Sequence, residues 1–171
     1  TIMSFSHPSY PEEKEARYQM LLSQSAALLD ETLNPIANLA NIAALLADAL
    51  PQINWCGFYL MDHGALTLGP FCGLPACTRI QPGRGVCGTA VQKDRVLCIA
   101  NVHDFPGHIA CDSASQSEIV LPIRHQGRVI GVLDIDSPAL ARFDETDEQY
   151  LSELVIQIQK ACPFDRASYT L

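Results

Sequence analysis

Two apolar segments on either side of a short glycine-containing turn constrain the fold of this chain more than any other feature. Residues 118–124 read EIVLPIR and residues 128–136 read RVIGVLDID, with His125-Gln126-Gly127 between them. Runs of this length, rich in β-branched residues and separated by a short turn with glycine, predict a β-hairpin. The chain is therefore expected to contain an antiparallel sheet.

Helical and strand patterns lie on both sides of this hairpin. Apolar spacing predicts helices over residues 12–30 and 35–50, and Asn34-Pro35 supplies an N-cap followed by proline at the start of the second helix. The remaining elements are expected in the order strand 53–61, strand 65–70, a short helix from Val86, strand 96–100, a polar connection over 101–117 and a last helix capped by Asp144.

Helices at both ends of one central antiparallel sheet define an α+β domain. The chain has 171 residues, which is enough for one domain with its own core. We expect the domain to span residues 12–162, with a mobile N-terminal tail over 1–11 and a C-terminal tail over 163–171.

Composition narrows the class of protein. The formal net charge is −8, so the chain repels phosphate backbones and a nucleic-acid partner is not expected. An uninterrupted apolar run of about 18 residues is absent, so no membrane span is expected. The first residues lack a basic start followed by an apolar run, which argues against a secretory signal and for a cytoplasmic location.

Seven cysteines are the residues that carry the most chemical information: Cys56, Cys72, Cys77, Cys87, Cys98, Cys111 and Cys162. An odd number without a signal argues against a secreted disulfide framework. Cys56 and Cys98 lie inside apolar strand patterns and are interpreted as small buried hydrophobic residues. Cys162 follows the last helical stripe, where a neutral role is expected.

Three other cysteines, Cys77, Cys87 and Cys111, lie in or beside irregular segments where a thiol can be reached. A single loop cysteine is more often inert than catalytic, but three in one domain favour a redox function. Cys72 is a fourth loop cysteine with no assigned role. A zinc site built from His103, His108 and Cys111 with Cys77 or Cys87 is the alternative, but the spacing is loose and no C-x-x-C pair occurs.

Carboxylates gather on one face of the predicted hairpin. Asp134 and Asp136 share a face of their strand, and Ile135 takes the other. A two-residue loop would place Glu118 on the Ile135 face, whereas a three-residue loop with Gly127 in the left-handed conformation would place Glu118 opposite Asp134. We expect the three-residue loop, because it puts Gly127 at the left-handed position that such loops use. Two carboxylates on one face of an otherwise apolar strand indicate function, and the alternative is a solvated strand end.

We expect this cluster to contain an acid with a raised pKa. Like charges crowded together raise at least one pKa, and a carboxylic acid that stays protonated near neutral pH can donate a proton. On the strand 53–61, Trp55, Gly57 and Tyr59 share a face, and the glycine leaves a slot between the two rings. Ordinary core packing is the alternative for these aromatic residues.

The motifs NWCGFYL, GPFCGLPAC, GRGVCGTAV, HIACDSASQSEIVLP and IGVLDIDS, in this order, resemble those of the free methionine-(R)-sulfoxide reductases. These are enzymes made of a single GAF domain, and the resemblance covers roughly residues 18–160. It implies that Cys111 is the nucleophile, Cys77 the resolving cysteine and Cys87 a third redox cysteine. It also implies a substrate pocket made of Trp55, Tyr59, Glu118, Asp134 and Asp136, with Glu118 and Asp136 taking part in catalysis.

The resemblance implies reduction of free L-methionine (R)-sulfoxide through a cysteine sulfenic acid and an intramolecular disulfide. Thioredoxin is the implied external reductant, no bound cofactor or metal is expected, and a homodimer is implied. A stand-alone GAF module that senses a small molecule or the redox state is the alternative function.

Overall fold

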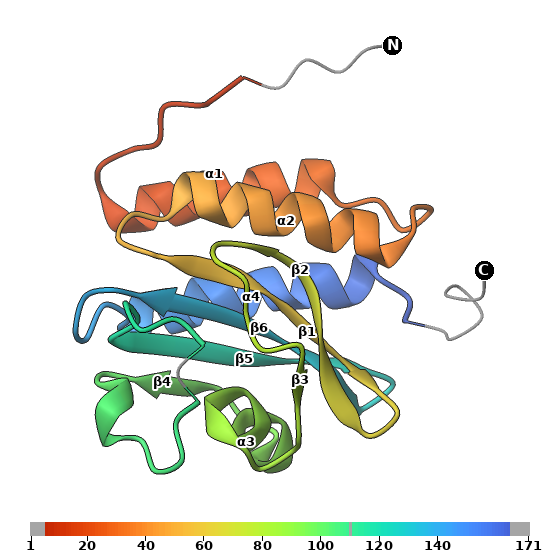
Figure 1. The fold of residues 1–171 in the computed structure, drawn as a ribbon. Helices are drawn as coiled ribbons and strands as arrows, with labels where there is room; N and C mark the ends of the chain where they lie inside the picture. Colours follow the sequence, from red (N-terminus) through yellow and green to blue (C-terminus); the bar gives the residue numbers. More distant parts are fainter. Residues whose placement is uncertain (1–5, 110, 165–171) are drawn as a thin grey trace.

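The computed structural model describes residues 6–109 and 111–164, and the α+β arrangement expected from the sequence is confirmed (Figure 1). The helices are α1 (Lys14–Leu28), α2 (Pro35–Ala49), α3 (Gly85–Lys93) and α4 (Glu145–Ala161), with a short 3₁₀ helix, η1, over Val102–Asp104. The strands are β1 (Trp55–Asp62), β2 (Ala65–Cys72), β3 (Arg79–Ile80), β4 (Leu97–Ile99), β5 (Ser117–His125) and β6 (Arg128–Ser137). Among the described residues, no helix is both long and apolar enough to cross a bilayer.

One antiparallel sheet forms the centre of the domain, with the strand order β3-β2-β1-β6-β5-β4. Figure 1 shows α1, α2 and α4 on one face of this sheet and α3 on the other. On the first face α2 packs on β1 and β2 while α4 packs on β5, and α1 covers both helices. On the second face α3 packs on β5 and β6. The sheet therefore separates a helical layer from a face covered mainly by α3 and loops.

The helical layer encloses the larger apolar core. Leu133 and Ile135 of β6 point into it and are fully buried, as the alternation predicted. The predicted caps are also present, because the Asn34 side chain accepts a hydrogen bond from the Ile36 amide and Asp144 forms a capping box with Asp147. These caps fix where α2 and α4 begin.

The hairpin between β5 and β6 differs from the prediction in its loop. His125 pairs with Arg128, so the loop holds two residues, Gln126 and Gly127, and the three-residue loop is wrong. Both loop residues have positive φ, 51° and 74°, as a type I′ turn requires. The positive φ predicted for Gly127 is therefore confirmed in a different turn.

A β-bulge close to this turn supplies the extra residue that the loop lacks. Ile123 pairs with Gly131 whereas Arg124 pairs with Val129, so Ile130 is left without a partner in the register. One extra residue reverses which face each later residue of β6 shares with β5. The predicted grouping of carboxylates is thus reached through the bulge.

Segment boundaries at the two ends of the chain stay predictions. The proposed tails over residues 1–11 and 163–171 lie partly outside the described residues. Within the described part, α1 begins at Lys14, two residues later than predicted, because the Glu13 side chain caps it by accepting hydrogen bonds from two amides of the first turn.

Candidate active site

The bulge brings three carboxyl groups to the face of the sheet that α3 covers. Glu118 of β5 pairs with Asp136 of β6, and Asp134 lies two residues further along the same face. The prediction that Glu118 and Asp134 share a face is confirmed, although the directly opposite residue is Asp136 and not Asp134. Glu118 is 5% exposed and Asp134 is 6% exposed, while Asp136 is partly buried.

Burial raises the pKa of all three acids, and repulsion by neighbouring acids adds to the rise at Glu118 and Asp136. Burial raises the pKa of Glu118 well above its ordinary value, and the neighbouring Asp134 and Asp136 add to this rise. Burial also raises the pKa of Asp136 well above its ordinary range, helped by Asp134. The pKa of Asp134 is raised by burial to about 6, and hydrogen bonds from Glu118 and Cys87 limit the rise. Burial and the neighbouring acids thus favour the neutral form of Glu118, while a pKa of about 6 leaves Asp134 mostly ionised near pH 7.

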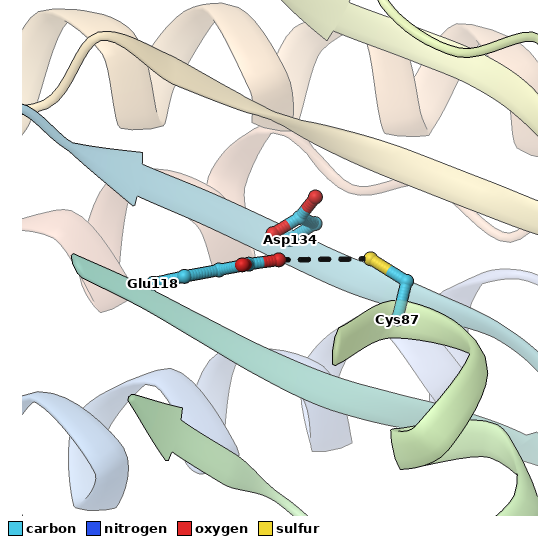
Figure 2. A group of neighbouring side chains, drawn as sticks. All are labelled: Cys87, Glu118 and Asp134. Carbon is cyan, nitrogen blue, oxygen red and sulfur yellow. Dashed lines mark hydrogen bonds between the residues drawn. The ribbon is translucent and has the colours of Figure 1, made fainter. Parts of the chain in front are cut away.

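Two further side chains contact Glu118 from outside the hairpin. The Cys87 thiol of α3 lies with its Sγ atom 4.0 Å from Glu118 Oε1 (Figure 2). On the other side, His108 Nε2 lies 3.8 Å from Glu118 Oε2. Burial and the neighbouring His103 lower the pKa of His108, so the imidazole is neutral near pH 7. His108 is therefore part of the site, a role that the sequence indicated only within the zinc alternative.

The aromatic residues of β1 form one wall of the site. Trp55 stacks on Tyr59 with ring centroids 5.9 Å apart and on Phe71 of β2 with centroids 5.2 Å apart. Both predicted residues line the cavity, but the slot expected over Gly57 is filled by Phe71. A side chain at Gly57 would collide with Phe71, so glycine is required for this stack. Across the sheet, Gly57 pairs with Asp134 and sets the acid beside the rings.

A disulfide joins Cys77 and Cys111 across the mouth of the site, with Cα atoms 5.8 Å apart. This is the cysteine pair that the resemblance named as resolving residue and nucleophile. Two hydrogen bonds anchor the segment after Cys111, because Asn54 Nδ2 donates to Asp112 Oδ2 at 2.9 Å and to Ser115 Oγ at 3.0 Å. Tyr59 donates to the Cys77 carbonyl at 3.0 Å and so links the aromatic wall to the disulfide.

The cavity between these groups is small in the disulfide form. Its free volume is about 40 Å³, which holds only a few water molecules. Its lining includes residues that the sequence did not single out: Leu74, Pro75, Ala76, Ile80, Arg84, Gly85, Val86, Ile109, Asp112 and Ser115. All but Ile80 fall inside three of the motifs that carry the family resemblance, but no local pattern shows that these separate segments meet at one cavity.

Three predictions about the other five cysteines were wrong. Cys98 is exposed on the short edge strand β4, where alternate residues face outward, and is not buried. Cys72 ends strand β2 and is not in a loop. Cys87 is 4% exposed inside α3, so its thiol is not freely reached. Cys56 and Cys162 are buried.

The zinc set proposed as an alternative is not assembled. Cys77 and Cys111 are joined to each other, which leaves neither sulfur as a thiolate ligand in this form. Within residues 6–109 and 111–164, the one group of three potential ligand residues with atoms within 4.8 Å of one another is Cys87, Glu118 and Asp134. This group contains only one member of the predicted set.

Comparisons with known proteins agree with this geometry. The GAF domain family model matches residues 27–162. The free methionine-R-sulfoxide reductase of Escherichia coli is 57% identical over 125 residues, which are 73% of this chain and 76% of that protein. The reduced form of the Staphylococcus aureus protein fRMsr is 51% identical with a TM-score of 0.82, over 84% of this chain and 94% of that one. The Neisseria meningitidis free methionine-R-sulfoxide reductase was solved in complex with its substrate. It is 44% identical with a TM-score of 0.84, over 91% of this chain and 95% of that one.

The fold and the family match define a GAF-domain protein with a thiol–carboxyl site. Within that class, the chain belongs to the free methionine-R-sulfoxide reductase family.

Proposed function

We propose that this protein reduces free L-methionine (R)-sulfoxide to methionine, with Cys111 as the nucleophile and Cys77 as the resolving cysteine. The observation that carries the proposal is the Cys77–Cys111 disulfide beside a cavity lined by three carboxyl groups. A disulfide at this position is what one turnover of such an enzyme would leave behind. The names of the related proteins support the same substrate.

In the first step, the Cys111 thiolate attacks the sulfoxide sulfur and the S–O bond breaks. The oxygen ends on Cys111 as a sulfenic acid and methionine is released, so the sulfoxide is reduced by two electrons and the cysteine is oxidised by two electrons. The oxygen must be protonated as it leaves the substrate sulfur. Glu118 supplies this proton, because burial and the neighbouring Asp134 and Asp136 raise its pKa and favour its protonated form.

The substrate's amino-acid end is held by charge. Asp134 carries the negative charge that pairs with the substrate ammonium, since its pKa of about 6 leaves it ionised at pH 7. Asp136, two residues further along β6, accepts a second ammonium hydrogen bond. The Trp55 and Tyr59 rings pack against the thioether end. A peptide-bound methionine sulfoxide lacks the free ammonium, so this arrangement selects the free amino acid.

In the second step, the Cys77 thiol condenses with the Cys111 sulfenic acid and releases water. Thioredoxin then reduces the disulfide by thiol–disulfide exchange, since its low potential favours electron transfer to a disulfide of this kind. Burial raises the pKa of the Cys87 thiol and keeps it neutral. We therefore assign Cys87 a hydrogen-bonding role toward Glu118 in place of the redox role expected from the sequence.

Reduction of the disulfide also admits the substrate. The cavity of about 40 Å³ is too small for an amino acid, and Cys111 and Ile109 form part of its wall. Breaking the bond to Cys77 releases this segment and lets the cavity widen. In this proposal the cavity is closed after each turnover, when the disulfide has formed, and opens again when thioredoxin has reduced the disulfide.

A cytoplasmic homodimer is part of the proposal. Two apolar side chains on the outer surface of the helical layer, Ile36 of α2 and Ile156 of α4, are 38% and 49% exposed and suit burial against a second copy. Sedimentation equilibrium measures this association.

The direct test incubates the reduced protein with free L-methionine (R)-sulfoxide, thioredoxin and its reductase, and measures methionine. The expected result is continuous methionine production, with at least about tenfold less product from N-acetylmethionine (R)-sulfoxide, because loss of a charge-assisted contact costs at least about 1.5 kcal/mol. Binding of the free amino acid without production of methionine would favour the sensor function.

A further inference from the structure

Three potential metal ligands from three different elements meet on the α3-covered face of the sheet. The Cys87 sulfur from α3, a Glu118 oxygen from β5 and an Asp134 oxygen from β6 all lie within 4.8 Å of one another. Figure 2 shows the Cys87 side chain directed from α3 toward the two carboxyl groups on the neighbouring strands. Donors held on a helix and two strands have fixed positions, which suits a coordination site.

One of these donors has an unused lone pair in a buried position. Asp134 is 6% exposed, and its Oδ1 atom has no hydrogen-bond partner within the described part of the chain. A buried carboxylate oxygen without a donor costs free energy, and a bound cation would remove that cost. The unpartnered atom thus points independently to a missing positive group at the same place.

The donor set distinguishes among possible cations. Its members are one thiol sulfur and two carboxyl groups, and His108 Nε2 adds an imidazole nitrogen 3.8 Å from Glu118 Oε2. Calcium and magnesium prefer oxygen donors alone, and an ammonium group gains little from sulfur. Sulfur, nitrogen and oxygen around one centre are the ligands of Zn²⁺. The 4.0 Å between Cys87 Sγ and Glu118 Oε1 is within about half an ångström of the separation of two ligands on one tetrahedral Zn²⁺.

We propose that Cys87, Glu118 and Asp134, with His108 as the nearest further donor, form a binding site for Zn²⁺ whose occupation excludes the substrate. Binding replaces the thiol proton of Cys87 and the carboxyl proton of Glu118 with the metal, and both protons are released to water. Exclusion follows because the metal takes the Asp134 carboxylate that would hold the substrate ammonium, and this part of the inference rests on the proposed function. Free zinc then inhibits the enzyme without touching Cys111.

The test uses the oxidised protein, in which the Cys77–Cys111 disulfide removes those two sulfurs as ligands. Co²⁺ replaces Zn²⁺ as the probe, because a thiolate bound to Co²⁺ gives a charge-transfer absorption that carboxylates do not. The expected result is one Co²⁺ per chain with this absorption, and its loss on addition of Zn²⁺. Absence of binding, or binding without the absorption, overturns the proposal.

Substitutions of Cys87 and Asp134 show whether the cobalt absorption arises at this site. Cys87→Ser should abolish the charge-transfer absorption, and Asp134→Asn should weaken binding by at least about tenfold, since even outer-shell changes have effects of that size. Cys98→Ser is the matched control, because Cys98 is an exposed cysteine on β4 outside the site, and it should bind Co²⁺ like the wild type. An absorption that persists in Cys87→Ser would place the metal elsewhere and refute the assignment.

Exclusion is tested separately with L-methionine, the proposed product, in the double variant Cys77→Ser, Cys111→Ser, which has neither the disulfide that closes the cavity nor the two thiols that could compete for the metal. Calorimetry first shows whether methionine binds, and the same concentration should then lower the apparent Co²⁺ affinity. Methionine that binds and leaves the cobalt absorption unchanged refutes the exclusion. A protein that binds Co²⁺ through Cys87 but neither binds methionine nor makes it from the sulfoxide retains the metal site and refutes the proposed function.

Discussion

Two buried aspartates, on opposite sides of the sheet, have opposite surroundings. Asp147 in the helical layer is fully buried and is satisfied on every side. Lys14 Nζ lies 2.6 Å from its Oδ2, Arg142 Nη1 lies 3.2 Å from its Oδ1, and the Tyr18 hydroxyl donates to it at 2.6 Å. Asp134 on the other face is buried with two more acids nearby and keeps an oxygen without a partner.

The contrast between Asp147 and Asp134 distinguishes a buried charge that stabilises the fold from a buried charge that serves function. A buried carboxylate that is paired and hydrogen-bonded holds elements together, and here Asp147 joins α1 to the start of α4. A buried carboxylate without compensation lowers stability, and proteins retain such groups where a ligand supplies the missing partner. The helical layer therefore provides the stability that the α3-covered face gives up.

The largest expected effect is on the rate of catalysis when an acid on the α3-covered face is changed. Glu118→Gln removes the proposed proton donor and keeps the shape of the side chain, so the rate of the first step should fall by about 10²–10⁴-fold. Rapid-quench measurement of methionine in a single turnover checks this. The control is Glu153→Gln, an exposed residue of α4, which should have the wild-type rate. A Glu118→Gln rate within twofold of wild type would remove Glu118 as the acid.

The second prediction concerns stability in the helical layer. Asp147→Asn leaves Lys14 and Arg142 without their shared partner, and the free energy of unfolding should fall by about 3 kcal/mol. Urea unfolding followed by circular dichroism measures the change. Glu153→Gln on the same helix should change it by less than about 0.5 kcal/mol. Equal effects of the two substitutions would mean that the Asp147 network contributes little.

The third and smallest effect is the pH dependence of stability. The pKa of Asp134 is raised to about 6 in the folded state, so its contribution to stability is fully present below about pH 4 and is lost as the pH rises through about 6. Asp134→Asn removes this group. The free energy of unfolding of this variant, relative to wild type, should therefore improve from about pH 4 to about pH 7. A difference that is constant with pH would show that Asp134 does not titrate abnormally.

Much of the fold could be predicted because it depends on local patterns. Alternation in β6 placed Leu133 and Ile135 in the core, and capping residues located the starts of α2 and α4. The loop of the β5–β6 hairpin could not be predicted, because a bulge at Ile130 and a longer loop have the same effect on the facing of later residues. Both solutions satisfy the same apolar pattern.

Site residues on strands with alternating apolar and polar residues could be predicted. Site residues whose position depends on contacts between distant segments could not. Nothing local shows that Phe71 fills the space over Gly57, that Cys98 is exposed on an edge strand, or that His108 meets Glu118. The sequence also could not distinguish structural from functional burial of the two acids, because Asp147 lies beside Thr146 and Glu148 in the first turn of α4 and nothing local shows that it is buried. Only the positions of Lys14 and Arg142 in the fold make the difference.

The central claim is that oxygen passes from the substrate to Cys111, and counting methionine per chain tests it most directly. Reduced protein, freed of excess reductant, is mixed with free L-methionine (R)-sulfoxide. We predict about one methionine per chain from wild type and from Cys77→Ser, with a sulfenic acid on Cys111 that a dimedone-type reagent traps only in Cys77→Ser. Cys111→Ser should release none, because a hydroxyl is a far weaker nucleophile than a thiolate. Methionine released by Cys111→Ser at the wild-type level would contradict the account.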